Sequence, residues 1–373
     1  MNEINQDDIR LAYPGFYNIY SIRNEISIHS MRLPTDDLPQ HQNSYLLDDH
    51  YGRVLQSNVS MPYAHSDAID FYVRDFDADI VDVLRVPFRK IPVYRFTDVH
   101  QIEKLANKLK DENEGYTVLL RGQTKFYPIK RDAEEFMFLY GENAPKEPSF
   151  HPSFLRSKFN DFFIYNLWHA QVANMLHDIG VDLSGFLPEV KIKEYYADVD
   201  KIKGSPHFTP LALGIAQHYG LPSIGLDLTK DVKVACWFAS HELKTGDKGV
   251  TSAPPLVDFK ESTIYFFRCP ADAVFSHQHV KPKFVENTRP DRQDAWFCHA
   301  GWGFAKNQLG SYLMAAIRLD ESILSIFKDG YDHHLFPGRE EDLMLNFFLD
   351  MRENDSQKGE VARALERIYL LGT

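Results

Sequence analysis

A short polar stretch of the sequence carries the side chains that are most able to do chemistry. The segment QHYGLPSIGLDLT, residues 217–229, holds Gln217, His218, Asp227 and Thr229. Glycine and asparagine alone are enough to build a turn between two elements, so these four polar groups exceed what the connection requires. We therefore predict that this corner of the fold is a ligand site.

A second candidate is Arg121, which follows the apolar run YTVLL. The β-branched and leucine residues of this run predict a buried strand that carries the arginine at its end, at the rim of a sheet. A guanidinium binds phosphate or diol oxygens with a rigid fork, and Gly122 beside it lets a ligand or a neighbouring backbone approach closely. The alternative is that Arg121 pairs with a carboxylate at the strand end.

The other candidates also have purely structural interpretations. Thr229 is suited to be the N-cap of a helix predicted over residues 230–243. A buried Asp227 must be paired, so it could brace that cap or Arg121. His218 is equally well explained as an ordinary satisfied histidine. Both interpretations stay open for each residue at this point.

Periodicity predicts the elements that position these residues. Helices are predicted where apolar residues recur on one face, and strands where short apolar runs occur. The predicted helices cover residues 98–112, 153–179, 208–219 and 230–243, and two closing helices cover 333–350 and the tail GEVARALERIYLL. STIYFFRC is a second clear strand, and residues 245–255 are predicted to be a loop. We therefore expect an α+β fold with a mixed, split β-sheet and helices packed around it.

Residues 1–90 differ in pattern from the rest, with short broken apolar alternations that favour strands and loops. We therefore expect a β-rich N-terminal extension over 1–90 and a main domain over 91–373. The extension carries many aromatic residues among acids, which suggests a lid, a partner-docking surface or a second small core. These aromatic residues are Tyr13, Phe16, Tyr17, Tyr20, Tyr63, Phe71 and Tyr72.

Composition narrows the function classes. The chain has 373 residues, of which 44% are hydrophobic and 13% aromatic, as in a well-folded globular protein. A formal net charge of -12 argues against a protein that coats nucleic acid nonspecifically, although a local basic cleft stays possible. No long apolar run and no signal-peptide pattern is present, so we expect a cytoplasmic protein that does not enter membranes.

The spacing of the cysteines and histidines indicates neither a metal site nor disulfide bonds. The three cysteines, Cys236, Cys269 and Cys298, are widely spaced in apolar surroundings, which suits buried thiols in a reducing compartment. The pairs His277/His279 and His333/His334 have no cysteine or carboxylate at the usual ligand spacings. We therefore assign no metal site.

Four motifs, taken in order, resemble the FRG domain family, which is named for its (F/Y)RGQ start. They are LLRGQ at 119–123, PSFLR at 152–156, AQHYGLP at 216–222 followed by GLDLT and VACWFA, and NTRPDRQDAWF at 287–297. The resemblance spans about residues 91–345. Leu120 replaces the usual aromatic residue, Ser223-Ile224-Gly225 stands where Thr-Arg-Leu is usual, and Leu228 replaces tryptophan. Loss of the loop arginine removes one candidate phosphate contact.

A weaker similarity links the chain to the arginine-type ADP-ribosyltransferases, through Arg121-Gly122, Thr229 and Gln293. It implies NAD as substrate, cleaved through an oxocarbenium-like ribosyl cation. Catalytic roles would fall to Arg121, His218, Asp227, Thr229 and Gln293, with Glu286 and Glu341 as rival carboxylates. NAD would be bound by Arg121, Gly122, Gln123, Arg156, Gln217, Tyr219 and Arg289.

The resemblance also suggests a biological setting. Freestanding FRG proteins resemble mobile accessory proteins of bacteria and of phage defence, which implies a toxin-like effector with a protein or nucleic-acid target and, as in toxin–antitoxin pairs, a neutralising protein partner. The rival hypothesis is a noncatalytic module that binds a nucleotide, a nucleic-acid end or a peptide. A nuclease is the weakest alternative, because no acidic cluster has metal-binding spacing.

Overall fold

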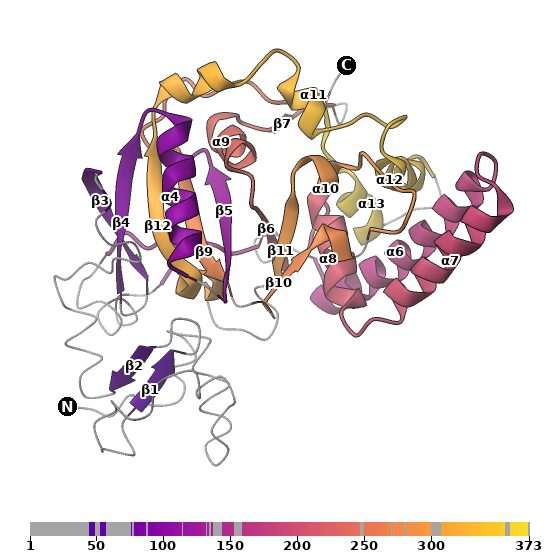
Figure 1. Cartoon of the computed structure of the whole chain (residues 1–373), viewed down its shortest axis with the longest axis horizontal. Helices are drawn as coiled ribbons and strands as arrows, with labels where there is room; N and C mark the ends of the chain where they lie inside the picture. Colours follow the sequence, from indigo (N-terminus) through magenta and orange to yellow (C-terminus); the bar gives the residue numbers. More distant parts are fainter. Residues whose placement is uncertain are drawn as a thin grey trace.

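The fold is built on one mixed sheet, which confirms the predicted α+β class (Figure 1). The computed structural model describes residues 45–48, 53–56, 76, 78–86, 89–113, 115–131, 133, 136, 144–152, 159–246, 250–269, 271, 273–279, 281–299, 307–354 and 359–371. The sheet order is β10-β11-β6-β5-β9-β12-β4-β3, and of these pairings only β12 with β4 is parallel. The strands are β3 (Ile80–Val86), β4 (Arg89–Phe96), β5 (Thr117–Gln123), β6 (Gly225–Thr229), β9 (Thr263–Cys269), β10 (Val274–Ser276), β11 (Ala295–His299) and β12 (Leu313–Leu319).

Two helices, α4 (Val99–Asp111) and α9 (Val232–Ser240), cover one face of this sheet (Figure 1). The side chain of Asp98 caps α4 by accepting the backbone N–H of His100, and the apolar side of α4 faces the strands. α9 approaches β5 most closely. A methyl group on Gly122 would lie 2.0 Å from the carbonyl oxygen of Ala235, so glycine is what allows this contact.

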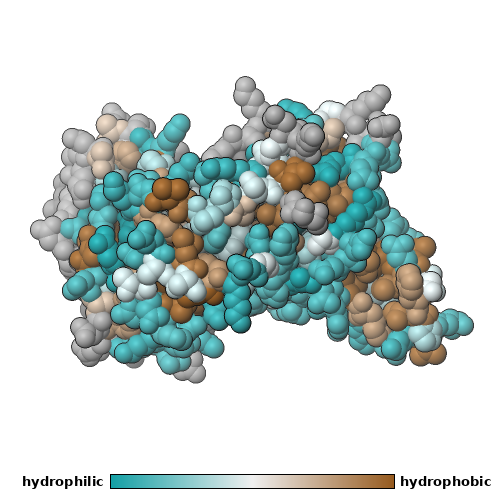
Figure 2. Space-filling model, turned by 90° about the horizontal axis from the view of Figure 1, so that it is seen from above, coloured by the Kyte–Doolittle hydropathy of each residue, from teal (hydrophilic) through white to brown (hydrophobic). Residues whose placement is uncertain are grey.

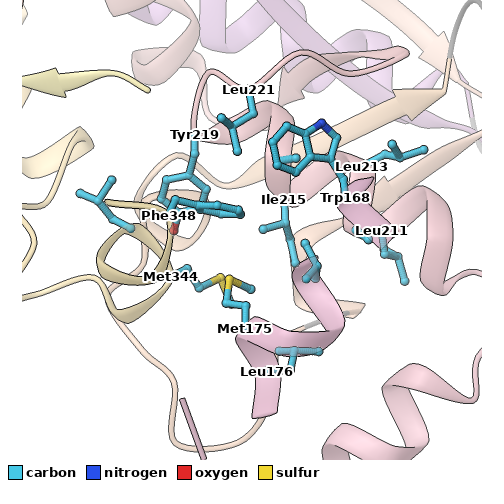
Figure 3. Packing of buried hydrophobic residues seen from close by; sticks show 14 of the residues in the cluster. Trp168, Met175, Leu176, Leu211, Leu213, Ile215, Tyr219, Leu221, Met344 and Phe348 are labelled. Atoms are coloured by element: carbon cyan, nitrogen blue, oxygen red, sulfur yellow. The ribbon is translucent and has the colours of Figure 1, made fainter. Parts of the chain in front are cut away.

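A helical lobe packs beside the β6 end of the sheet (Figure 1). It contains α6 (Asp161–Leu183), α7 (Glu189–Lys203), α8 (Phe208–His218), α12 (Leu343–Glu353) and α13 (Glu360–Leu365). Figure 3 shows its core, in which the ring of Tyr219 lies beside Phe348 with 5.3 Å between centroids. The indole Nε1 of Trp168 donates to the carbonyl of Pro222 at 2.7 Å, so this core also holds the loop that follows α8.

Smaller elements complete the description. A three-stranded sheet joins β7 (Lys244–Thr245), β8 (Val250–Ser252) and β13 (Leu370–Leu371), and a separate hairpin pairs β1 (Tyr45–Asp48) with β2 (Arg53–Gln56). Short helices are α10 (Arg289–Arg292) and α11 (Tyr331–Leu335), with 3-10 turns η4 (His277–His279), η5 (Gln308–Tyr312) and η6 (Glu321–Ile326). Hydrophobic residues gather at one end of the molecule in Figure 2. Val181, Phe186 and Val190, on α6, α7 and the turn between them, are exposed.

Several sequence predictions differ from the structure at element boundaries. The helix predicted from 153 begins at Asp161, because the side chain of Asn160 caps it by accepting the N–H of Phe163. The predicted helix 333–350 is broken into α11 and α12 by the segment around Pro337. The predicted loop 245–255 contains β8, and α7 was not predicted.

The predicted start of the main domain at residue 91 falls inside β4. β3 and β4 form an antiparallel hairpin within the eight-stranded sheet, so residues from Ile80 onward belong to the main fold. The N-terminal aromatic residues named above lie outside the described residues. No helix of the described part is long and apolar enough to cross a membrane.

Candidate functional site

The eight-stranded sheet is nearly split between β5 and β6. These two strands pair only at Leu120 and Thr229, whereas every residue of β5 has a partner in β9. Beyond the single pair, Nη1 of Arg121 donates to the carbonyl oxygen of Asp227 at 2.6 Å. The arginine therefore bridges two strands that have stopped sharing backbone hydrogen bonds, and space for a ligand opens beside it.

That space is a cavity of about 230 Å³, which we call the inner cavity. Its walls come from β5, β6, the end of α8, α9, Phe336 and Tyr369, and they include Arg121, Gly122, Gln217, His218, Asp227, Thr229 and Gln293. The candidate residues Arg121, His218, Asp227 and Thr229 thus lie on the wall of one cavity. Their catalytic and binding roles stay predictions.

A buried histidine supports the one carboxylate among the described residues of the inner wall. Nδ1 of His218 lies 2.9 Å from Oδ1 of Asp227, and Nε2 of Gln217 donates to its Oδ2 at 3.3 Å. The side chain of His218 is 3% exposed and that of Asp227 is 36% exposed. Oε1 of Gln217 is buried without a described hydrogen-bond partner. Gln217 therefore holds one oxygen of the Asp227 carboxylate, and His218 lies beside the other oxygen, which is buried; Oε1 of Gln217 is left free to accept from a ligand.

Thr229 and Gln293 reach the cavity wall, but their polar groups are already used within the fold. The hydroxyl of Thr229 donates to the carbonyl of Gln293 at 2.8 Å and accepts the N–H of Asp231 at 3.0 Å. The amide of Gln293 donates to the carbonyl of Leu335 at 3.1 Å. Thr229 was predicted as the N-cap of the following helix, but that cap is Asp231, which accepts the N–H groups of Lys233 and Val234.

Arg289 and Tyr219 lie beneath the cavity and are absent from its lining. The guanidinium of Arg289 is buried, with Nη2 donating to the carbonyl of Tyr369 at 2.7 Å and Nη1 to that of His218 at 3.5 Å. The hydroxyl of Tyr219 donates to the buried carboxylate of Asp342 at 2.7 Å. Both residues therefore hold segments of the cavity wall through hydrogen bonds, and their contact with NAD stays a prediction.

A second cavity of about 270 Å³, the outer cavity, adjoins the first. It shares Arg121, Gly122 and three apolar residues with the inner cavity, and Gln123, Tyr127, His151 and His241 line its other sides. Of the remaining candidates, Glu286 is exposed and Glu341 pairs with Arg292 at 2.9 Å, and neither lines these cavities. Arg156 lies outside the described residues.

A family profile described as the FRG domain matches residues 155–248. This chain contains an FRG domain. No curated protein and no solved structure matches the chain. The matched segment supplies Gln217, His218 and Asp227, whereas Arg121 and Tyr369 reach the cavity from outside it.

The departures from the FRG pattern have local packing reasons. A methyl group on Gly225 would lie 2.2 Å from Cζ of Phe297, so a larger residue at this place would displace that ring. Leu228 is buried in the core on the sheet face opposite α4 and α9. Ile224, which stands where an arginine is usual, is buried in the core of the helical lobe, so both this place and that of the usual tryptophan are filled by apolar side chains.

Tyr369, Phe238 and Phe336 are cavity residues that sequence reasoning did not single out. Phe336 lies in the predicted closing helix 333–350, and Phe238 lies in the predicted helix 230–243. Tyr369 had no usable signal, because its segment is predicted as a closing helix. In the structure α13 ends at Leu365, which frees the following residues to reach the cavity.

Within the described part of the chain, no three His, Cys, Asp or Glu side chains come together as a group that could hold a metal ion. His277 instead lies 3.1 Å from Asp291, and its Nδ1 lies 2.9 Å from the carbonyl of Ala295. All three cysteines are buried, and burial raises the pKa of the thiols of Cys236, Cys269 and Cys298. The thiols are therefore protonated near neutral pH and serve as packing groups.

Asp291 anchors the short helix that carries Arg289, and it should make stability depend on pH. Thr288 and Asp291 form a capping box at the start of α10. Burial acts to raise the pKa of Asp291, but hydrogen bonds from His277, Lys281 and Thr288 outweigh it and lower the pKa to about 2. A carboxyl group with a depressed folded pKa stabilises the fold above its unfolded pKa, near 3.9, and this stabilisation fades as pH falls toward 2.

We therefore expect Asp291→Asn to be less stable than the unchanged chain by about 2 kcal/mol at pH 6, and the difference should shrink at pH 3. Urea unfolding at both pH values measures it. Asp350→Asn, at an exposed carboxylate paired with Arg339, is the control and should show a much smaller change. A difference for Asp291→Asn that is equal at both pH values would contradict the assignment.

Proposed function

We propose that the chain is a NAD-dependent ADP-ribosyltransferase that modifies a macromolecule. The observation that carries the proposal is that two adjoining cavities share Arg121 at the place where β5 and β6 separate. NAD consists of two nucleosides joined by a pyrophosphate. Each cavity suits one nucleoside, and the fork of Arg121 suits the pyrophosphate between them.

The chemistry assigned to the inner cavity is attack at the ribose carbon that carries nicotinamide. The bond from this carbon to the nicotinamide nitrogen breaks, and its electron pair leaves with nicotinamide. A bond to an oxygen or nitrogen of the target forms, and the proton of that group passes to solvent. Positive charge develops on the ribose as the bond breaks, and a fixed carboxylate beside it lowers the barrier.

Asp227 is the group that we assign to this role. Its carboxylate is held by His218 and Gln217, lies on the cavity wall and is partly exposed. Gln293, which the resemblance to transferases favours, has its amide bound to Leu335. We therefore assign Gln293 and Thr229 to positioning the wall, and Asp227 to the contact with ribose.

A second function is a noncatalytic nucleotide-binding module. The hydrogen bonds that Thr229 and Gln293 make within the fold favour it. If the transferase-like positions Thr229 and Gln293 serve only the fold, the cavity could hold a nucleotide without cleaving it. The two functions differ in whether nicotinamide is released and label is transferred. We propose a toxin role, a role in phage defence and a neutralising partner only together with the transferase function, and not for the binding module.

Incubating the full chain with NAD labelled in its adenylate phosphate, together with a crude cell lysate, tests the transferase proposal. We expect label on a macromolecule and release of nicotinamide, with both reduced about a hundred-fold in Asp227→Asn. Binding of ADP-ribose to Asp227→Asn, measured by calorimetry, should stay close to that of the unchanged chain, because the arginine fork is retained.

Protease and nuclease treatment of the labelled product distinguishes a protein target from a nucleic-acid target. Asp258→Asn, at a surface site outside both cavities, is the matched control and should transfer label normally. Binding of ADP-ribose with no release of nicotinamide would support the binding module instead. Absence of both binding and transfer would refute both functions.

A further inference from the structure

Tyr369 brings a group from the C-terminal tail into the inner cavity. It follows α13 and directly precedes β13, which pairs in parallel with β8. Its side chain lines the inner cavity together with Arg121 and Asp227. The matched FRG segment ends at residue 248, so this wall of the cavity is supplied from outside it.

The backbone of Tyr369 is held firmly on both sides. Its N–H donates to the carbonyl of Tyr219 at 3.4 Å, and its carbonyl accepts Nη2 of Arg289 at 2.7 Å. Its ring lies against Gly220, where φ is +86° and an added methyl group would lie 2.9 Å from Cδ2 of the ring. The turn that follows α8, the helix of Gln217 and His218, is therefore held against the C-terminal tail at this residue.

The hydroxyl of Tyr369 differs from those of the neighbouring buried tyrosines. Tyr219 donates its hydroxyl proton to Asp342, and Tyr195 donates its own to the carbonyl of Leu176. Among the described residues, none forms a hydrogen bond with the hydroxyl of Tyr369. A polar group on a cavity wall that the protein leaves unused is available to a ligand.

The charges around this phenol also suit an anionic or hydroxylated ligand. Burial raises the pKa of Tyr369, the charge of Asp227 adds to this, and Arg367, Arg121 and Arg289 act in the opposite direction. The phenol is therefore a neutral hydrogen-bond donor near neutral pH. It shares the cavity wall with a carboxylate that can only accept, Asp227, and an arginine that can only donate, Arg121.

We propose that Tyr369 is a further ligand-binding residue, whose hydroxyl donates a hydrogen bond to a ribose or phosphate oxygen of the nucleotide that Arg121 holds beside Asp227. This inference rests on the proposed function, because it takes NAD or its ADP-ribose part as the ligand. A phenol can also accept a hydrogen bond from a ribose hydroxyl that at the same time donates to another acceptor. Tyr369 would thus help to fix the ribose against Asp227.

Calorimetric titration of the full-length Tyr369→Phe variant with ADP-ribose tests the inference. This change removes the hydroxyl and keeps the ring that packs on Gly220, so the melting temperature should change little. We expect the dissociation constant to rise about ten-fold or more, as for loss of a hydrogen bond to a charged or strongly polar group. A parallel titration with inorganic pyrophosphate shows which oxygen the hydroxyl contacts. Weaker binding of both ADP-ribose and pyrophosphate indicates a phosphate oxygen, and weaker binding of ADP-ribose alone indicates a ribose oxygen.

Tyr331→Phe is the matched control. Tyr331 belongs to the same hydrophobic cluster as Tyr369 but does not line either cavity. The dissociation constant of Tyr331→Phe for ADP-ribose should therefore equal that of the unchanged chain. If Tyr369→Phe binds ADP-ribose as tightly as Tyr331→Phe does, the inference is wrong while the proposed function stands. If the unchanged chain binds neither NAD nor ADP-ribose, the proposed function fails and the inference fails with it.

Discussion

Arg121→Ala should transfer about a hundred- to a thousand-fold less label from NAD than the unchanged chain, the loss seen when one fixed charge-stabilising group is removed from a reacting site. The reason is its position on the wall shared by both cavities, where no other described residue can replace its fork. Rates of nicotinamide release, followed by chromatography, measure the effect.

The same variant should remain folded. Arg121 is half-buried at the end of β5, and Nη1 of its guanidinium donates to the carbonyl of Asp227 on β6. Loss of such a bond costs about 1 kcal/mol, which shifts the melting temperature of a chain of this size by only a few degrees.

Two companion variants make the test of Arg121 specific. Arg121→Lys keeps the charge but loses the planar fork, so its activity should lie between that of the unchanged chain and that of Arg121→Ala. Arg363→Ala removes an exposed arginine on α13 that pairs with Glu360, and it should be fully active. If Arg121→Ala is insoluble, the arginine is structural; if it is fully active, Arg121 does not belong to the site.

The second large effect concerns stability. Gly122→Ala should lower the free energy of unfolding by about 3 kcal/mol or more, the upper part of the range for overpacked sites. A methyl group there would lie 2.0 Å from the carbonyl oxygen of Ala235 and 2.6 Å from the backbone nitrogen of Ala239. Because both atoms belong to the backbone of α9, only a shift of the whole helix away from β5 could relieve the contact.

Urea unfolding of Gly122→Ala beside Gly338→Ala measures this effect. A methyl group on Gly338 would meet no atom within 4 Å, and its backbone is not in the left-handed region, so this control should be close to neutral. Equal unfolding midpoints for the two variants would show that α9 can move without cost. Gly122 would then be required by a ligand and not by the helix.

The elements that could be predicted from the sequence are those with a strong local signal. β5 and β9 were recognised from apolar runs bounded by polar residues, and α4 from its cap and its apolar spacing. The polar corner of the site was recognised because Gln217, His218 and Asp227 are close in sequence as well as in space. Arg121 was found because its charge follows directly on a buried run.

The misassigned features depend on contacts between distant segments. Arg289 was predicted to contact NAD, but its guanidinium donates to the carbonyls of His218 and Tyr369, which local sequence cannot reveal. Tyr369 reaches the cavity because β13 pairs with β8, more than a hundred residues earlier. A two-residue strand has no periodicity of its own, so the tail was predicted as a helix.

The strand order of the sheet has a consequence for how the protein is made. β4 is complete once residue 96 has left the ribosome, but its parallel partner β12 begins only at Leu313, and β5 waits for β9 at Thr263. The FRG segment thus emerges before the central strands that join both sides of the sheet. A nascent chain that stalls before residue 313 would expose unpaired edges of β4 and β9, the kind of surface that aggregates unless a chaperone shields it.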